Sequence, residues 1–149
     1  MRLLGLRSHS AAELGRKLGR RGFDADTVAG VLGRLATQGY LDDFQFARAV
    51  VGHRSRNRGA SAIAAELTSK GVERSLVQAA VAELDPEVEV EAALRIVRPL
   101  LRRAEPGSLR SLLQVAGPRL LRRGYGPRVV REACRRALSG DGSLPGNVG

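Results

Sequence analysis

The chain has 149 residues, 43% of them apolar and 27% charged, which is typical of a folded globular protein and excludes a disordered one. It contains no Trp, three Phe and two Tyr, so its core must rest on Leu, Val and Ala, which favours packed helices over a sheet. Lys and Arg number 25 against 15 Asp and Glu, and the net charge of +10 points to polyanionic or acidic partners.

The first predicted helix begins at a capping-box sequence. The Ser10 hydroxyl can accept the backbone N–H of Glu13, whose carboxylate can reach back to the serine amide. Leu14 and Leu18 share one face of this helix. We expect Gly22 to end it, because glycine tolerates the left-handed conformation that closes a last turn.

Two further helices are predicted before residue 58. Asp24 is the expected N-cap of the second, whose apolar residues recur at helical spacing: Val28, Val31, Leu32 and Leu35. We expect Gly39 to end this helix. Asp42 and Asp43 should then open a third helix, which passes through Phe46, Ala47 and Val50.

The same pattern recurs at a period of 49 residues. Seven residues keep their character in the second copy: Ile63, Leu67, Gly71, Val72, Val77, Val81 and Leu84. Asp85 and Pro86 then predict the start of the next helix, since proline is favoured at a first helical position. A third copy follows at Gly124, with Leu120 before it and Tyr125, Val130, Cys134 and Ala137 after it.

Proline and glycine predict further boundaries near the end of the chain. Pro99 should kink or end the sixth helix, and Gly117-Pro118 should do the same in the seventh. Gly126-Pro127 should start the last helix. Self-similarity at a period near 50 residues is typical of stacked helical units. We therefore predict an all-α fold of three tandem three-helix repeats, at residues 1–58, 59–104 and 105–138, with a flexible tail at 139–149.

The sequence offers no set of residues for catalysis. His9 and His53 lie in polar, basic surroundings and are expected at the surface. Asp42 and Asp43 suit helix capping better than a metal or acid–base site, because adjacent helical residues do not face each other. Cys134 falls on an apolar stripe and is expected in the core. We predict no enzyme, cofactor or metal.

Basic residues are the remaining candidates for a function. They gather on helices of the first and third repeats: Arg16, Lys17, Arg20, Arg21, Arg119, Arg122, Arg123, Arg128, Arg131 and Arg135. Such residues can form a solvated face, or they can bind phosphate and carboxylate groups, which arginine contacts in bidentate fashion. Because aromatic residues are scarce, a contact with nucleic acid should involve its phosphates and not its bases.

Two DNA-binding hypotheses remain open from these residues. Residues 12–41 could form a winged helix-turn-helix, although the supposed recognition helix carries only one basic residue, Arg34, and no alternating strand pattern follows Tyr40. A non-specific DNA-binding protein would also explain the arginines. No apolar run approaches a membrane span of about 20 residues and no secretory signal is recognisable, so a cytoplasmic protein is expected.

Four segments of the chain resemble the RecX family, the modulators of the RecA recombinase. They are SHSAAELGRKLGRRGFD at residues 8–24, GYLDDFQFA at 39–47, RGASAIAAELTSKGV at 58–72 and RLLRRGYGPRVVREA at 119–133. The resemblance implies an elongated, curved array of three-helix repeats without enzymatic activity. It also implies a protein that lies in the groove of the RecA filament on single-stranded DNA and restrains ATP hydrolysis, filament growth and strand exchange. We expect this protein to be a monomer.

The second repeat departs from the family pattern. Relatives place basic residues where this chain has Ala62, Ala64 and Thr68, and they run helices through the positions of Pro99 and Gly117-Pro118. We therefore expect the basic residues of the two outer repeats to carry the contacts with the filament.

Overall fold

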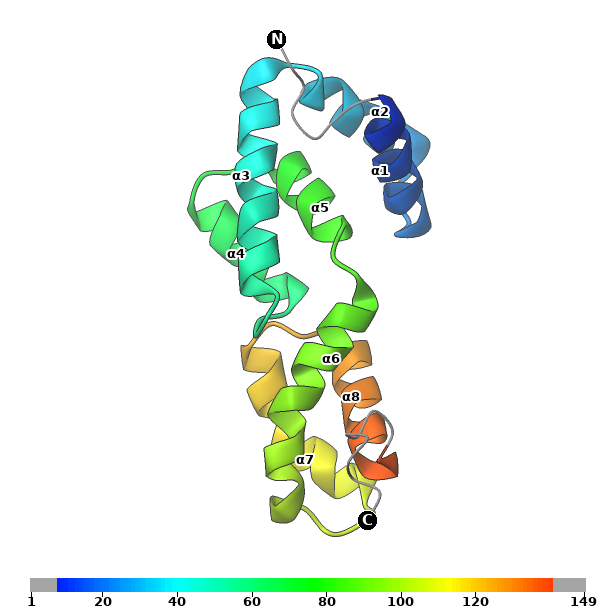
Figure 1. Ribbon diagram of the computed structural model, residues 1–149, viewed down its shortest axis with the longest axis vertical. Helices are drawn as coiled ribbons and strands as arrows, with labels where there is room; N and C mark the ends of the chain where they lie inside the picture. Colours follow the sequence, from blue (N-terminus) through cyan, green and yellow to red (C-terminus); the bar gives the residue numbers. More distant parts are fainter. Residues whose placement is uncertain (1–7, 141–149) are drawn as a thin grey trace. The chain divides into compact units, whose positions relative to one another are not determined.

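The computed structural model describes residues 8–140, and all regular structure in that range is helical (Figure 1). The prediction of an all-α fold is confirmed. The predicted tail lies almost wholly outside the described residues, since only Ser139 and Gly140 belong to both. The elements are α1 (Ser8–Arg20), α2 (Ala25–Leu35), α3 (Gln38–Arg54), α4 (Ala60–Ser69), α5 (Arg74–Ala82), α6 (Pro86–Val97), the 3-10 helix η1 (Arg98–Arg103), α7 (Leu109–Arg122) and α8 (Pro127–Ser139).

These helices form two compact units. Unit 1 comprises the described parts of Met1–His53 together with Ile63–Asp85, and unit 2 comprises Arg54–Ala62 with the described parts of Pro86–Gly149. The segment between α3 and α4 therefore belongs to unit 2, far along the chain from most of its neighbours. This division into two units does not test the predicted boundaries of the three sequence repeats, which stay a prediction.

Three glycines end helices as expected. Gly22, Gly71 and Gly124 have φ angles of 96°, 88° and 96°, in the left-handed region that glycine adopts without a steric penalty. After each glycine, the next amide donates to the carbonyl five residues earlier at 3.1 Å, which is the bond of a Schellman motif. These pairs are Phe23 to Leu18, Val72 to Leu67 and Tyr125 to Leu120.

The predicted starts of two helices are wrong. The chain is already helical at Ser8, so Ser10 lies inside α1 and does not begin it. The second helix ends at Leu35 and is capped by Ala36, while Gly39 lies inside α3. The aspartates expected to open that helix, Asp42 and Asp43, are exposed and follow its first turn.

Packing explains why α3 starts early. The residues of α3 that are buried recur at helical spacing: Leu41, Phe44, Ala47 and Val51. Leu41 continues this row at helical spacing when the helix already includes the preceding residues, so packing favours the early start over the low helix propensity of Gly39. Phe46 lies in this helix as predicted, but outside the buried row, since its side chain is 46% exposed. The Lys70 ammonium lies 5.9 Å from the centre of the Phe46 ring.

The proline positions have different outcomes. Pro99 follows the last residue of α6 by two positions and lies in η1, so the predicted end of this helix is confirmed. The pair Gly117-Pro118 does not end α7, which continues to Arg122. A proline ring normally clashes with the Cβ of the residue before it, which disfavours a helical conformation there. Gly117 has no Cβ, so it can stay helical before Pro118.

The predicted start of α8 is also confirmed: Gly126 is its N-cap and Pro127 its first residue.

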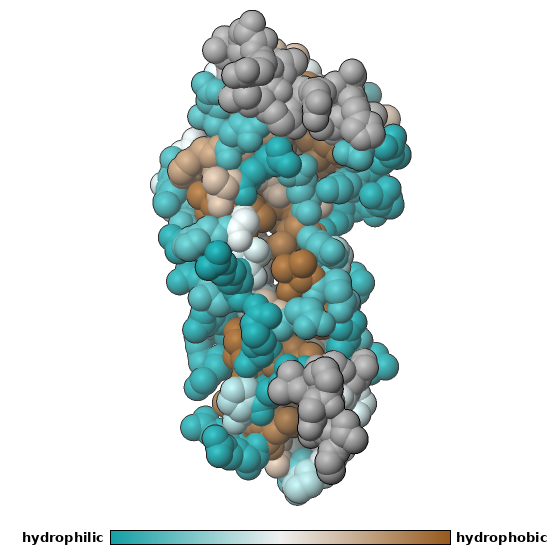
Figure 2. Space-filling view, viewed as in Figure 1, coloured by the Kyte–Doolittle hydropathy of each residue, from teal (hydrophilic) through white to brown (hydrophobic). Residues whose placement is uncertain are grey.

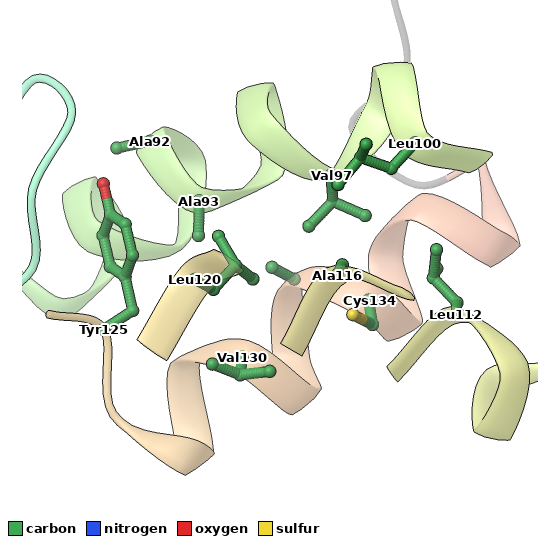
Figure 3. Packing of buried hydrophobic residues seen from close by; sticks show 11 residues of the cluster. Ala92, Ala93, Val97, Leu100, Leu112, Ala116, Leu120, Tyr125, Val130 and Cys134 are labelled. Carbon is green, nitrogen blue, oxygen red and sulfur yellow. The ribbon is translucent and has the colours of Figure 1, made fainter. Parts of the chain in front are cut away.

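The core of unit 2 is built from small and branched apolar residues of α6, α7 and α8 (Figure 3). Cys134 is fully buried in this cluster, and burial raises the pKa of its thiol to about 11. Its predicted role as a core residue is confirmed. Tyr125 is the largest side chain of the cluster and is only 1% exposed.

Candidate interaction surfaces

The described residues show no cluster of side chains of the kind that binds a metal ion. The side chain of His53 is exposed, whereas that of His9 lies outside the described part. Within residues 8–140, no group of three or more His, Cys, Asp and Glu side chains could hold a metal ion. In the same range, no helix combines the length and apolar character needed to cross a bilayer. On the face that Figure 2 shows, most of the coloured surface is hydrophilic, with smaller hydrophobic areas between.

Unit 1 carries four of the predicted site residues on α1 and the turn after it. Arg16 and Arg20 are exposed one helical turn apart, and Lys17 is half-buried. Arg21 has a structural contact: its Nη2 donates to the carbonyl oxygen of Leu84 at 2.7 Å. This bond joins the end of α1 to the residues after α5, so Arg21 is the member of this group with a role in packing.

Unit 2 carries the other six predicted site residues, all of them exposed. Arg119, Arg122 and Arg123 lie at the end of α7, and Arg128, Arg131 and Arg135 follow one another along α8. Two of the six make a side-chain hydrogen bond or an ion pair within residues 8–140. Arg135 Nη1 lies 3.4 Å from Glu132 Oε1, and Arg123 Nη1 donates to the carbonyl oxygen of Asn57 at 3.1 Å.

The acidic residues near α8 are held by an arginine that the sequence analysis did not select. Arg136 lies 2.6 Å from a carboxylate oxygen of Glu87, 2.9 Å from Glu132 and 3.9 Å from Glu91. Hydrogen bonds with Glu87 and Glu132 raise the pKa of Arg136. The bond between Arg136 and Glu87 in turn lowers the pKa of Glu87. Arg136 thus joins α6 to α8, and it occupies carboxylates that could otherwise neutralise the outer arginines.

The site prediction did not include residues 56–61, which run from the loop after α3 into the first turn of α4. We call these residues the clasp, because they bond to the corner between α7 and α8. The amide of Gly59 donates to Arg123 O at 2.9 Å, and the amide of Ser61 donates to Gly124 O at 3.1 Å. The amide of Ala60 donates to the buried carboxylate of Glu89 at 2.8 Å.

Two arginine side chains complete the clasp. Arg95 Nη2 on α6 donates to the carbonyl oxygen of Arg56 at 3.0 Å, and Arg123 uses the next carbonyl along, that of Asn57. The sequence carried only a weak signal for this arrangement, namely the polar, basic composition of residues 53–58. The partners are 39 and 66 residues apart, so no local spacing could reveal them.

These observations define a class: a basic, all-helical protein of repeated helical units with many exposed arginines. The model for the first three-helix domain of RecX matches residues 1–35, and the model for its second three-helix domain matches residues 42–81. The chain belongs to the RecX family of regulatory proteins.

Curated relatives extend the match to most of the chain. It is 40% identical to the regulatory protein RecX of Mycobacterium sp. (strain KMS), over 95% of this chain and 80% of the relative. It is 35% identical to that of Mycobacterium avium (strain 104), over 95% and 83%. It is 38% identical to that of Mycobacterium ulcerans (strain Agy99), over 95% and 83%. No solved structure matches the chain.

The winged helix-turn-helix hypothesis is wrong for the described residues. A wing requires a β-hairpin after the recognition helix, and residues 8–140 contain no strand. The residues after Tyr40 continue as α3 to Arg54.

Proposed function

We propose that this protein is a non-catalytic regulator of RecA, a cytoplasmic monomer that binds in the groove of the filament on single-stranded DNA. There it restrains ATP hydrolysis, filament growth and strand exchange. One observation carries the proposal: in a member of a family of regulators, exposed arginines of α7 and α8 make no ion pair within residues 8–140. These are Arg119, Arg122, Arg128 and Arg131.

The electrostatics of α8 support a role in binding. Arg128 and Arg131 are three residues apart and Arg135 follows four residues later, so like charges lie along one side of the helix. Each such pair destabilises an isolated helix by about 0.2–0.5 kcal/mol. A partner with negative charges would remove this repulsion, and a guanidinium can bind a phosphate or a carboxylate through two hydrogen bonds.

Attachment through several weak contacts suits a long, periodic partner. The basic residues of α1 belong to unit 1 and those of α7 and α8 belong to unit 2. When one contact is made, the second forms at a high effective concentration, so the total affinity exceeds that of either surface alone. Neither surface needs a deep pocket for this mode of binding.

The test reverses two charges on α8. We expect the R128E/R131E variant to lose most of the suppression of RecA's DNA-dependent ATPase, while its helical circular dichroism stays unchanged. R102E/R103E is a matched control, because it changes the same charge at exposed arginines of η1. Equal suppression by R128E/R131E and the control would contradict the proposed role of α8.

A non-specific DNA-binding protein is the alternative function. Co-sedimentation at physiological ionic strength with RecA filaments and with bare single-stranded DNA separates the two. A regulator of the filament should bind RecA-coated DNA in preference. Equal binding to both, with log K falling steeply against log salt, would favour the alternative.

A further inference from the structure

The clasp places arginine side chains from distant parts of unit 2 beside one another. The guanidinium groups of Arg95 and Arg123 bond to consecutive carbonyl oxygens, those of Arg56 and Asn57. Both guanidinium groups also act on the same phenol: burial and the charge of Glu89 raise the pKa of Tyr125, and the charges of Arg123 and Arg95 partly offset this rise. Two residues on separate helices are thus held close together by one short segment.

The cationic side chains of this cluster form no ion pair within the described residues. Neither Arg95 nor Arg123 makes an ion pair within residues 8–140, and both are exposed. Arg56 and Arg58 add two more exposed cations from the clasp itself. The acid at this position, Glu89, is only 8% exposed and accepts the amide of Ala60, so its position is fixed beneath the surface.

A bond to a carbonyl oxygen does not exhaust an arginine. The guanidinium has five N–H donors, and Arg95 and Arg123 each use one of them on the clasp. The remaining donors can bind an anion, while the carbonyl bond fixes the orientation of the group. A purely structural role would need this bond alone and no further partner.

The backbone of the clasp is also pre-arranged. Gly59 and Gly124 approach so closely that a Cβ on Gly59 would lie 2.5 Å from the Gly124 carbonyl. Since the segment is fixed by backbone hydrogen bonds on both sides of this contact, binding an anion costs less ordering than it would in a free loop.

We propose that Arg56, Arg58, Arg95 and Arg123 form a binding site for the phosphates of single-stranded nucleic acid. The inference rests on the proposed function, because it assigns the DNA of the filament to this surface. Guanidinium groups suit phosphate because they can bind it through two hydrogen bonds. The large apolar residues that are exposed in the described part, Phe46, Val88 and Leu121, do not belong to the site, so it lacks the apolar centre of a protein interface. The site has no aromatic platform at its surface on which a base could stack, so we expect its contacts to be with phosphates.

The test measures binding of a fluorescent oligodeoxythymidine to the full chain at several salt concentrations. Each lost phosphate contact should reduce the slope of log K against log salt by about 0.7, so R95Q/R123Q should lose about 1.4. R102Q/R103Q removes two exposed charges elsewhere in unit 2 and should leave the slope nearly unchanged.

A second variant protects the test against a folding defect. R56Q/R58Q removes two exposed side chains of the clasp and keeps the carbonyl oxygens that hold Arg95 and Arg123, so its melting temperature should match the wild type. Its slope should also fall by about 1.4. If both double variants bind the oligonucleotide like the control, or lose affinity only for free RecA protein, the site is overturned.

The two proposals can fail separately. RecA's ATPase is measured with the same variants. If the wild type suppresses the ATPase but R95Q/R123Q and R56Q/R58Q keep the wild-type salt slope, the phosphate site is wrong and the regulatory function stands. If the slope falls in both variants but the wild type leaves RecA unaffected, the site stands and the regulatory function fails.

Discussion

The corners at Gly71 in unit 1 and Gly124 in unit 2 have the same local structure in opposite surroundings. Both glycines have a positive φ, and both are followed by an amide that bonds five residues back. Gly71 is exposed, and a Cβ there would meet nothing within 4 Å. Gly124 is buried, and a Cβ there would lie 2.4 Å from the backbone nitrogen of Ala62. The local sequence therefore determines the turn, whereas a distant segment determines whether the turn is surface or core.

The largest expected effect follows from closing this space. Gly59→Ala and Gly124→Ala should each lower the free energy of unfolding of unit 2 by about 3 kcal/mol, because the added methyl group meets backbone atoms that cannot rotate away. Urea unfolding followed by circular dichroism measures the change. Gly39→Ala is the control, since its Cβ would meet nothing within 4 Å inside α3, and it should be neutral or stabilising.

A loss below about 1 kcal/mol in Gly59→Ala would show that the clasp can move away without cost. The close approach of the clasp to the corner at Gly124, which the corner at Gly71 lacks, would then contribute nothing to stability.

The open corners should respond less. Gly22→Ala and Gly71→Ala leave room for the methyl group but force alanine into a left-handed conformation, which costs about 1–2 kcal/mol. The same urea experiment should place both variants between the control and Gly124→Ala. If Gly71→Ala were as destabilising as Gly124→Ala, backbone conformation alone would explain all three corners, and the clasp would add nothing.

The features predicted correctly from sequence depend on neighbouring residues. Asp24 caps α2 by accepting the Thr27 amide at 2.7 Å, and this contact lowers the pKa of the aspartate. The glycine corners and the start of α8 are equally local. The start of α3 was missed because burial of Leu41 extends the helix backwards, and that burial depends on the packing of the whole unit.

The candidate site was predictable only in part, for a similar reason. The clusters on α7 and α8 are visible as arginines at helical spacing, and the structure confirms that they are exposed. Arg95 and Arg136 could not be selected, because their partners come from other helices or from the clasp. A sequence shows where cations are numerous, but only the fold shows which of them are already bonded.

The smallest expected effect concerns Tyr125, next to the closed corner. Its side chain is 1% exposed, and its hydroxyl makes no hydrogen bond within residues 8–140. Figure 3 shows this hydroxyl pointing away from the centre of the apolar cluster. Tyr125→Phe removes a buried polar group that has no partner, so stability at pH 7 should stay within about 1 kcal/mol of the wild type, and any change should be a gain.

High pH should enlarge the effect of Tyr125→Phe. Burial, and then the charge of Glu89, raise the pKa of the Tyr125 phenol from 10.0 to about 12. The unfolded chain therefore releases this proton at a lower pH than the folded chain, and stability falls between pH 10 and 12. Cys134 acts in the same direction between about pH 9 and 11, but equally in wild type and variant. Urea unfolding at pH 9 and 11.5 should thus show a larger loss for the wild type, whereas parallel losses would mean that the phenol ionises freely in the folded protein.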